Sequence, residues 1–291
     1  MRRAGSFLVL VPVLLALSAC GNAVAPSAGS GRSATPSVPT DGAKHVGVGL
    51  VLEDASHGPQ LCFGWNQSLP PKCSGVDLTG WDWATAEDRE SANGASWGMY
   101  AVTGVWDGER LAVTDVGPPT YPGHPADDPD LMTPCDPPAG GWAVVDEATA
   151  TDEALAAVRS YVTTQPDYAG RWIDQSINPA DGGENVEEEM NDPTLYILNV
   201  MFTGDLERHE ADIRALWGGS LCVSEAPRSE AELSAIQAEM NEEAGILASW
   251  TNDRAGTVEV SVVLDNGLQQ RMDEKYGDGV VVVTPSLLPA E

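Results

Sequence analysis

The segment 117–141 is the strongest constraint on the fold, because it carries eight prolines in 25 residues. Proline lacks a backbone N–H and fixes φ, so this density excludes a helix or a central strand. The segment is therefore predicted to be a connector between an N-terminal and a C-terminal part. The chain has 291 residues, and each part is long enough to bury a core of its own.

The N-terminal part, residues 45–116, has β-rich runs and no convincing helical period. Strands are predicted at 46–52, 60–65, 99–105 and 111–116. Asp107-Gly108 lies between the last two runs and is a typical hairpin turn. We expect a small antiparallel β barrel or sandwich.

The C-terminal part, residues 142–291, alternates helical and strand patterns. One helix is predicted to begin after Thr151, and another after Ser229, which forms a capping box with Glu232. Residues 258–264 alternate apolar and polar with a period of two, as in a strand with one buried face. These patterns predict a two-layer α+β module, ferredoxin-like in arrangement, and no internal repeat stands out. The predicted fold class of the whole chain is α+β.

The first twenty residues have the pattern of an export signal. Arg2 and Arg3 precede an apolar run at 7–17, which is too short to span a bilayer. Leu17-Ser18-Ala19-Cys20 then resembles the lipobox of bacterial lipoproteins. The resemblance implies that residues 1–19 are a signal peptide and that Cys20 receives diacylglycerol and a further fatty acid such as palmitate. An ordinary secretory signal with an incidental Cys is the alternative.

Residues 20–44 are predicted to be the acylated Cys followed by a flexible tether. Between positions 21 and 44, 18 of 24 residues are Gly, Ala, Ser, Thr or Pro. Two acyl chains give stable membrane anchoring. The expected location is the extracytoplasmic face of the cell membrane, with the protein attached through lipid.

The charge balance limits the partners. The chain has 44 acidic and 15 basic residues, for a net charge of −29. This balance argues against binding nucleic acid or anionic lipid through a general basic face. The expected partners are the membrane, through the anchor on Cys20, and an envelope protein, peptide or glycan.

Four cysteines remain after Cys20 is assigned to lipid: Cys62, Cys73, Cys135 and Cys222. An even number in an exported protein indicates two disulfides, with three possible connectivities. We expect Cys62 to pair with Cys73, since both lie in the β part about a hairpin apart, and Cys135 to pair with Cys222. A zinc site is the alternative, but the sequence contains no C-x-x-C and no His at ligand spacing.

Two short segments resemble motifs of catalytic sites. Residues 94–98 match G-x-S-x-G around Ser96, but what precedes them is polar and loop-like, and a strand is predicted after them. A Gly-rich turn before the hairpin is the favoured interpretation. His209-Glu210 begins like a zinc-protease motif without its second His, so His209 is predicted to be a helix-surface residue. No catalytic residue and no cofactor are assigned.

Residues 181–192 hold six carboxylates in twelve positions. Asp181, Glu184 and Asp192 are weak candidates for Ca²⁺ ligands, because the order of an EF-hand loop is absent. The favoured interpretation is a solvated acidic loop.

Trp81 and Trp83 flank Asp82 and would share one face of a strand. That face is a candidate platform for stacking against a sugar or a peptide aromatic side chain. The alternative is that both rings belong to the core of a small module.

The composition is similar to that of secreted lipoproteins of high-GC actinomycetes, with 12 Arg against 3 Lys. Cys62 and Cys73 around Pro70-Pro71, followed by Gly80-Trp81-Asp82-Trp83, add to this resemblance, which implies no particular activity. The leading hypothesis is a non-enzymatic binding or accessory lipoprotein of the envelope. The alternatives are a carboxylate-dependent hydrolase of cell-wall or extracellular substrates, and an acidic, Ca²⁺-braced interaction scaffold.

Overall fold

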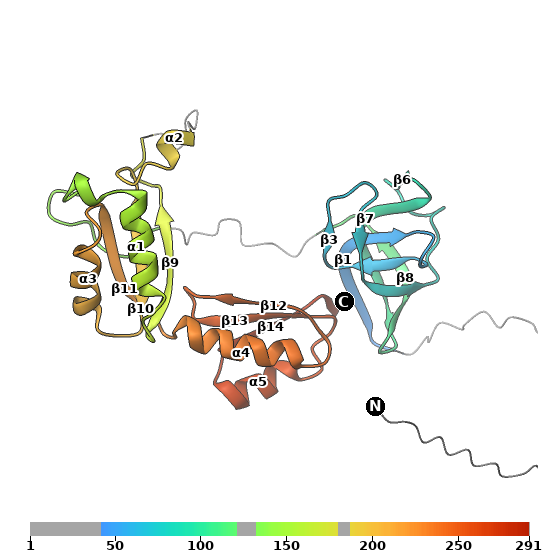
Figure 1. Ribbon diagram of the computed structural model, residues 1–291. Coiled ribbons are helices and arrows are strands. Elements are labelled where there is room, and N and C mark those ends of the chain that lie inside the picture. Colours follow the sequence, from blue (N-terminus) through green and yellow to red (C-terminus); the bar gives the residue numbers. More distant parts are fainter. Residues whose placement is uncertain (1–41, 121–131, 180–186, 291) are drawn as a thin grey trace, which may run out of the picture. The chain divides into compact units, whose positions relative to one another are not determined.

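The computed structural model describes residues 42–120, 132–179 and 187–290 (Figure 1). The fold is mixed α+β, with several sheets and more strand than helix. The signal peptide with Cys20, most of the tether and part of the acidic loop lie outside the described residues. Within these ranges, no helix has both the length and the apolar character that crossing a membrane requires.

The β part contains the predicted strands and the Asp107-Gly108 hairpin. Its elements are β1 (Lys44–Glu53), β2 (Gln60–Cys62), β3 (Trp65–Asn66), β4 (Lys72–Cys73), β5 (Val76–Thr79), β6 (Glu90–Ala92), β7 (Ala95–Trp106) and β8 (Arg110–Gly117). Pairing runs from β1 through β2, β5, β8 and β7 and returns to β1. All these pairs are antiparallel except β5 with β8. The inward side chains, among them Leu61, Val102 and Leu111, are fully buried in one cluster.

The last strand of the chain joins the first. Strand β15 (Leu287–Pro289) pairs antiparallel with residues 45–47 of β1. Leu287 is fully buried among the inward side chains of the β part. The sheet that begins at residue 44 is therefore completed by residues close to the end of the chain.

The C-terminal part consists of two units whose elements follow the same order, apart from the short helix α2 (Glu187–Met190), which the first unit has in addition. The first unit has α1 (Asp152–Val162), β9 (Tyr168–Asp174), β10 (Ile197–Phe202), α3 (Leu206–Arg214) and β11 (Ser220–Glu225). The second has α4 (Glu230–Glu242), β12 (Ile246–Asn252), β13 (Thr257–Val262), α5 (Leu268–Tyr276) and β14 (Val281–Pro285). In each, the middle strand pairs antiparallel with the strand before it and parallel with the strand after it. The predicted single ferredoxin-like module is not confirmed, because the region holds two three-stranded sheets.

The two units also share strand register, which makes them an internal structural repeat. Trp172 pairs with Asn199 in the first unit, and Trp250 pairs with Glu259 in the second. In each unit the first strand has a β-bulge at the equivalent place. In the first unit the bulge lies between the residues that pair with Met201 and Phe202, and in the second between those that pair with Ser261 and Val262. This repeat differs from the prediction, in which no internal repeat stands out. We refer to the two units as repeat 1 (residues 152–225) and repeat 2 (residues 230–285).

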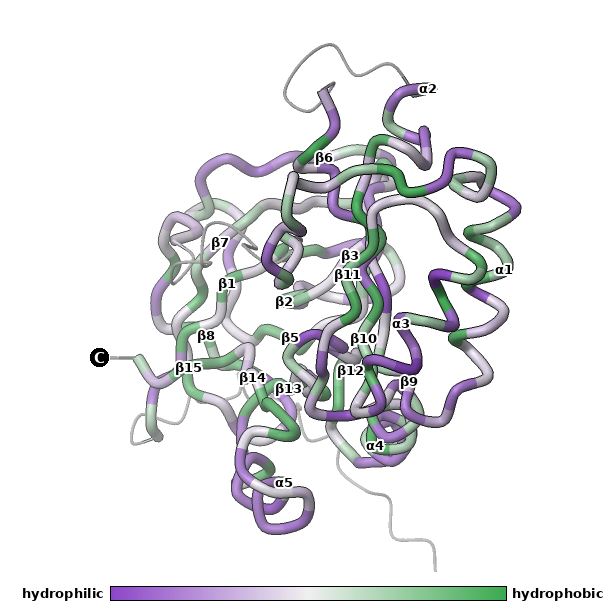
Figure 2. The backbone as a smooth tube through the Cα atoms, turned by 90° about the vertical axis from the view of Figure 1, so that its left-hand side faces the viewer, coloured by the Kyte–Doolittle hydropathy of each residue, from purple (hydrophilic) through white to green (hydrophobic). Residues whose placement is uncertain are grey.

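The helices of each repeat cover one face of its sheet. Thr151 and Ser229 accept hydrogen bonds from the backbone three residues later, and the predicted capping box of Ser229 with Glu232 is present. In repeat 1, Val158 and Val162 of α1 are buried against strand residues, and in repeat 2 Leu233 and Met240 of α4 are buried in the same way. Apolar residues concentrate in the strands, whereas α5 is mostly polar on its exposed turns (Figure 2).

The connector is bound to the other face of the repeat 1 sheet. Both predicted disulfides are present, and the one between Cys135 and Cys222 joins the connector to β11. The backbone N–H of Thr133 donates to the carboxylate of Asp174 at 2.7 Å, and the Asn199 amide donates to the Thr133 hydroxyl at 3.0 Å. Burial alone would raise the pKa of Asp174, but the hydrogen bonds that it accepts from Thr133 and Ser176 hold that pKa below its ordinary value.

Candidate functional site

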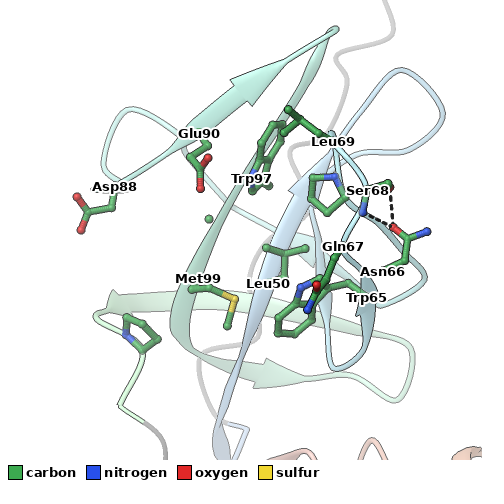
Figure 3. A pocket seen from close by; sticks show the side chains of 13 residues that line it. Leu50, Trp65, Asn66, Gln67, Ser68, Leu69, Asp88, Glu90, Trp97 and Met99 are labelled. Carbon is green, nitrogen blue, oxygen red and sulfur yellow. Dashed lines mark hydrogen bonds between the residues drawn. The ribbon is translucent and has the colours of Figure 1, made fainter. Parts of the chain in front are cut away.

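The candidate site is a cavity of about 510 Å³ on the outside of the β part (Figure 3). Its floor consists of Leu50, Trp97 and Met99, which strands β1 and β7 place together through the pairing of Leu50 with Met99. Leu50 and Trp97 are buried in an apolar cluster separate from the inward side chains of the strand ring. This cluster covers the outer face of the β1–β7 ribbon.

The loop between β3 and β4 forms one wall. The Cys62–Cys73 disulfide spans its base, and β3 pairs with β4. The side-chain oxygen of Asn66 accepts from the Ser68 hydroxyl at 2.7 Å and from the Lys72 backbone at 2.9 Å. These bonds hold the loop in one conformation, so a ligand would not have to order it on binding.

The loop presents apolar side chains to solvent. Trp65 is 42% exposed and Leu69 is 75% exposed, and both line the cavity with Pro71. Figure 3 shows Trp65 and Met99 on either side of Leu50, with Leu69 above Trp97. A ring or an aliphatic group would gain apolar contact here without displacing any part of the core.

Carboxylates form the opposite rim. Asp88 and Glu90 line the cavity, both are exposed, and Glu90 lies on β6 opposite Trp97. No Lys, Arg or His is among the residues that line this cavity. The arrangement therefore suits a ligand with an apolar or ring-shaped body and a cationic or hydrogen-donating group.

Trp81 and Trp83 lie next to this site but not in it. They lie in a turn segment after β5, not on a strand, and both are half-buried. Their rings form an edge-to-face pair at 5.2 Å, and Trp81 contacts Tyr100 in the same way. Both rings pack against the inward cluster of the β part, and the Trp83 indole N–H donates to Glu53. Their contacts are therefore those of core residues of the β part.

The G-x-S-x-G motif lies on a strand, not at a strand-to-helix turn. Ser96 is part of β7 and pairs with Ser91 of β6 and Glu53 of β1. Asn93 and Gly94 have positive φ angles of 51° and 81° and connect β6 to β7. Asn-Gly is the typical sequence of this two-residue hairpin turn, which agrees with the predicted Gly-rich turn.

His209 is fully buried, so its prediction as a helix-surface residue is wrong. Its two ring nitrogens lie 2.9 Å from the Tyr161 hydroxyl and 2.8 Å from the Asp167 carboxylate, and the ring stacks on Phe202. Burial alone would raise the pKa of Asp167, but the hydrogen bond to His209 and the positive charge of Arg208 hold that pKa below its ordinary value. The network braces α1 and α3 on the repeat 1 sheet.

Of the three candidate Ca²⁺ ligands, only Asp192 lies within the described residues. Asp181 and Glu184 lie outside the described residues, and Asp192 caps a turn by accepting from the Thr194 hydroxyl at 2.7 Å. Over residues 42–120, 132–179 and 187–290, no group of three or more His, Cys, Asp or Glu has the geometry to hold a metal ion.

The sequence matches no known family of proteins. A comparison with curated proteins gives no match either. The function must therefore be argued from the site alone.

Proposed function

We propose that the chain is a lipid-anchored binding protein on the extracytoplasmic face of a bacterial cell membrane. The lipobox-like residues Leu17-Ser18-Ala19-Cys20 and the Gly/Ala/Ser/Pro-rich tether support the anchor. The ligand lies in the cavity between the β3–β4 loop and β6. A peptide or glycan of the envelope with a cationic or hydrogen-donating group fits its apolar floor and acidic rim.

One observation supports the binding role most strongly: a loop fixed by a disulfide and by Asn66 holds Trp65 exposed to solvent. Leaving part of a large aromatic ring exposed forgoes hydrophobic stabilisation that burial would provide. A rigid loop that maintains this exposure opposite a carboxylate rim is typical of a ligand platform.

We further propose to describe residues 44–117 as a small β barrel. The pairing that returns to β1 supports this description, because a closed ring leaves its strands with few free edges.

Replacing Trp65 with Ala is expected to abolish ligand binding. The full chain is titrated with lysine- and arginine-containing peptides, muropeptides and glycans, and thermal unfolding is recorded. A ligand at 100 times its Kd stabilises by about 2.7 kcal/mol, which for a chain of this size raises Tm by about 5–10 °C. Trp65→Ala removes this shift, because the stacking surface is lost, and Glu90→Gln reduces it for cationic ligands only.

Val145→Ala is the matched control, because Val145 is an exposed apolar side chain that does not line the cavity. A shift that persists in Trp65→Ala would place the ligand elsewhere. Turnover of a panel compound that is abolished by one side-chain change would contradict the non-enzymatic role and favour the hydrolase alternative.

Replacing Cys20 with Ala is expected to release the protein from the membrane. The substitution removes the sulfur that would carry the diacylglyceryl group, and no helix in the described ranges can replace the anchor. Fractionation of cells that express the full chain measures the change as a move from the membrane to the soluble fraction. An unchanged membrane fraction, with Ala19→Gly as a processing-competent control, would contradict the lipid anchor.

A further inference from the structure

The face of the repeat 2 sheet opposite its helices can be compared residue by residue with the same face of repeat 1. Because the registers match, the row Trp172–Asn199–Cys222 of repeat 1 corresponds to the row Trp250–Glu259–Val282 of repeat 2. The helices of both repeats lie on the other side, against the alternate strand residues.

In repeat 1 this outer face is covered by the connector. Thr133 bonds to Asp174 and to Asn199, and Cys135 is joined to Cys222. The covered side chains are correspondingly buried: Asn199 is 0% exposed and Cys222 1%. A short Thr-Pro-Cys segment thus lies against the middle of this sheet, and the proline cannot continue a strand pairing.

In repeat 2 the equivalent row is open to solvent. Trp250 is 45% exposed and Val282 is 39% exposed, compared with the buried Cys222 at the position equivalent to Val282. The bulged residue Leu247 is 48% exposed as well.

The middle residue of the row sets the chemistry of an occupant. In repeat 1 it is Asn199, whose amide donates to the connector. In repeat 2 it is Glu259, which accepts one hydrogen bond from Asn252 at 2.9 Å and retains further acceptor capacity. A carboxylate at this place requires an occupant that donates hydrogen bonds or carries positive charge.

We propose that the outer face of repeat 2 is a docking site for an extended, basic segment of a partner protein. The segment lies across the sheet as residues 132–135 lie across repeat 1, with apolar side chains on Trp250 and Val282 and a Lys or Arg on Glu259 between them. The net charge of −29 favours such a partner by steering basic chains towards the protein. This site is separate from the Trp65 cavity.

The test uses the full chain and a labelled peptide, Lys-Met-Thr-Pro-Ser-Lys-Pro, designed on the segment that covers repeat 1. Fluorescence anisotropy is expected to give a Kd in the micromolar range that weakens as salt is added. Trp250→Ala weakens binding at least tenfold, and Val282→Lys does the same by repelling the probe. Glu259→Gln weakens it several-fold and flattens the salt dependence.

Leu288→Ala is the matched control, because Leu288 is 37% exposed but lies on β15. Trp65→Ala should leave peptide binding unchanged, which separates this site from the cavity. The proposal is overturned if the wild-type chain does not bind the peptide, if the variants bind it equally well, or if an acidic version with Glu for Lys binds as tightly. It is also overturned if sedimentation shows a dimer that Trp250→Ala dissociates, because a second copy would then cover the face.

Discussion

Replacing both Cys135 and Cys222 with Ser is expected to lower the free energy of unfolding by about 4–5 kcal/mol, from the loop-closure entropy of the bridge. The two residues are 87 positions apart, so the bridge excludes a large set of unfolded conformations. The native contacts across it remain, since Thr133 still bonds to Asp174 and Asn199. Guanidinium unfolding of the wild type and the double variant measures the change.

The matched control removes the other disulfide. Cys62 and Cys73 are 11 positions apart, and the same relation gives a smaller loss of about 3 kcal/mol for Cys62→Ser with Cys73→Ser. The two variants should also differ in which segment loses its covalent link. The Cys135/Cys222 variant releases the connector, and the Cys62/Cys73 variant releases the loop that carries Trp65. A larger loss in the control than in the Cys135/Cys222 variant would contradict the entropic account.

Trp217→Ala is expected to destabilise repeat 1 by about 3–5 kcal/mol, as is typical for removing a fully buried aromatic side chain. Trp217 is 0% exposed, stacks on Tyr196 at 6.1 Å, and donates its indole N–H to the Ser220 carbonyl. The small side chain leaves a cavity and an unpartnered carbonyl. Chemical unfolding followed by tryptophan fluorescence and circular dichroism measures the loss.

Trp217→Phe is the control for this prediction, because it keeps the ring and loses the hydrogen bond. Its expected cost is smaller, about 1–2 kcal/mol. A loss below about 1 kcal/mol for Trp217→Ala would show that repeat 1 repacks around the missing ring.

Much of the local structure could be predicted from the sequence, because its signals lie within a few residues of each other. The Asp107-Gly108 hairpin, the capping box at Ser229 and the alternating strand at 258–262 are of this kind. The disulfides could also be predicted, since four cysteines divided between two parts of a chain that is expected to be exported allow only three connectivities.

The internal repeat could not be predicted from the sequence, because the spacing between equivalent residues of its two copies is not constant. The first helix and strand of the two repeats are displaced by 78 residues, as Tyr168 and Ile246 show, whereas the later strands, from Ile197 and Thr257, are displaced by 60. The segment between β9 and β10 is longer than its counterpart between β12 and β13, which breaks any fixed period. Trp172 and Trp250 were a usable signal, because both stand fifth in strands of equal length.

The candidate site was missed for a different reason. Trp65 and the paired rings of Trp81 and Trp83 look alike in a sequence, and a pair suggests a platform more readily than a single Trp does. The difference is tertiary: Trp81 packs on Tyr100, whereas the Asn66 turn and the disulfide hold Trp65 away from the core. His209 was misjudged because its partners, Tyr161 and Asp167, are more than 40 residues away.

The pairing of β15 with β1 has a consequence for the order in which the sheet of the β part is completed. During synthesis β1 is available early, but the edge at residues 45–47 has no β15 partner until residues 287–289 have been made. An open strand edge is a site for aberrant pairing. Removal of residues 287–289 would leave that edge open and would leave a space where Leu287 packs among the inward side chains of the β part.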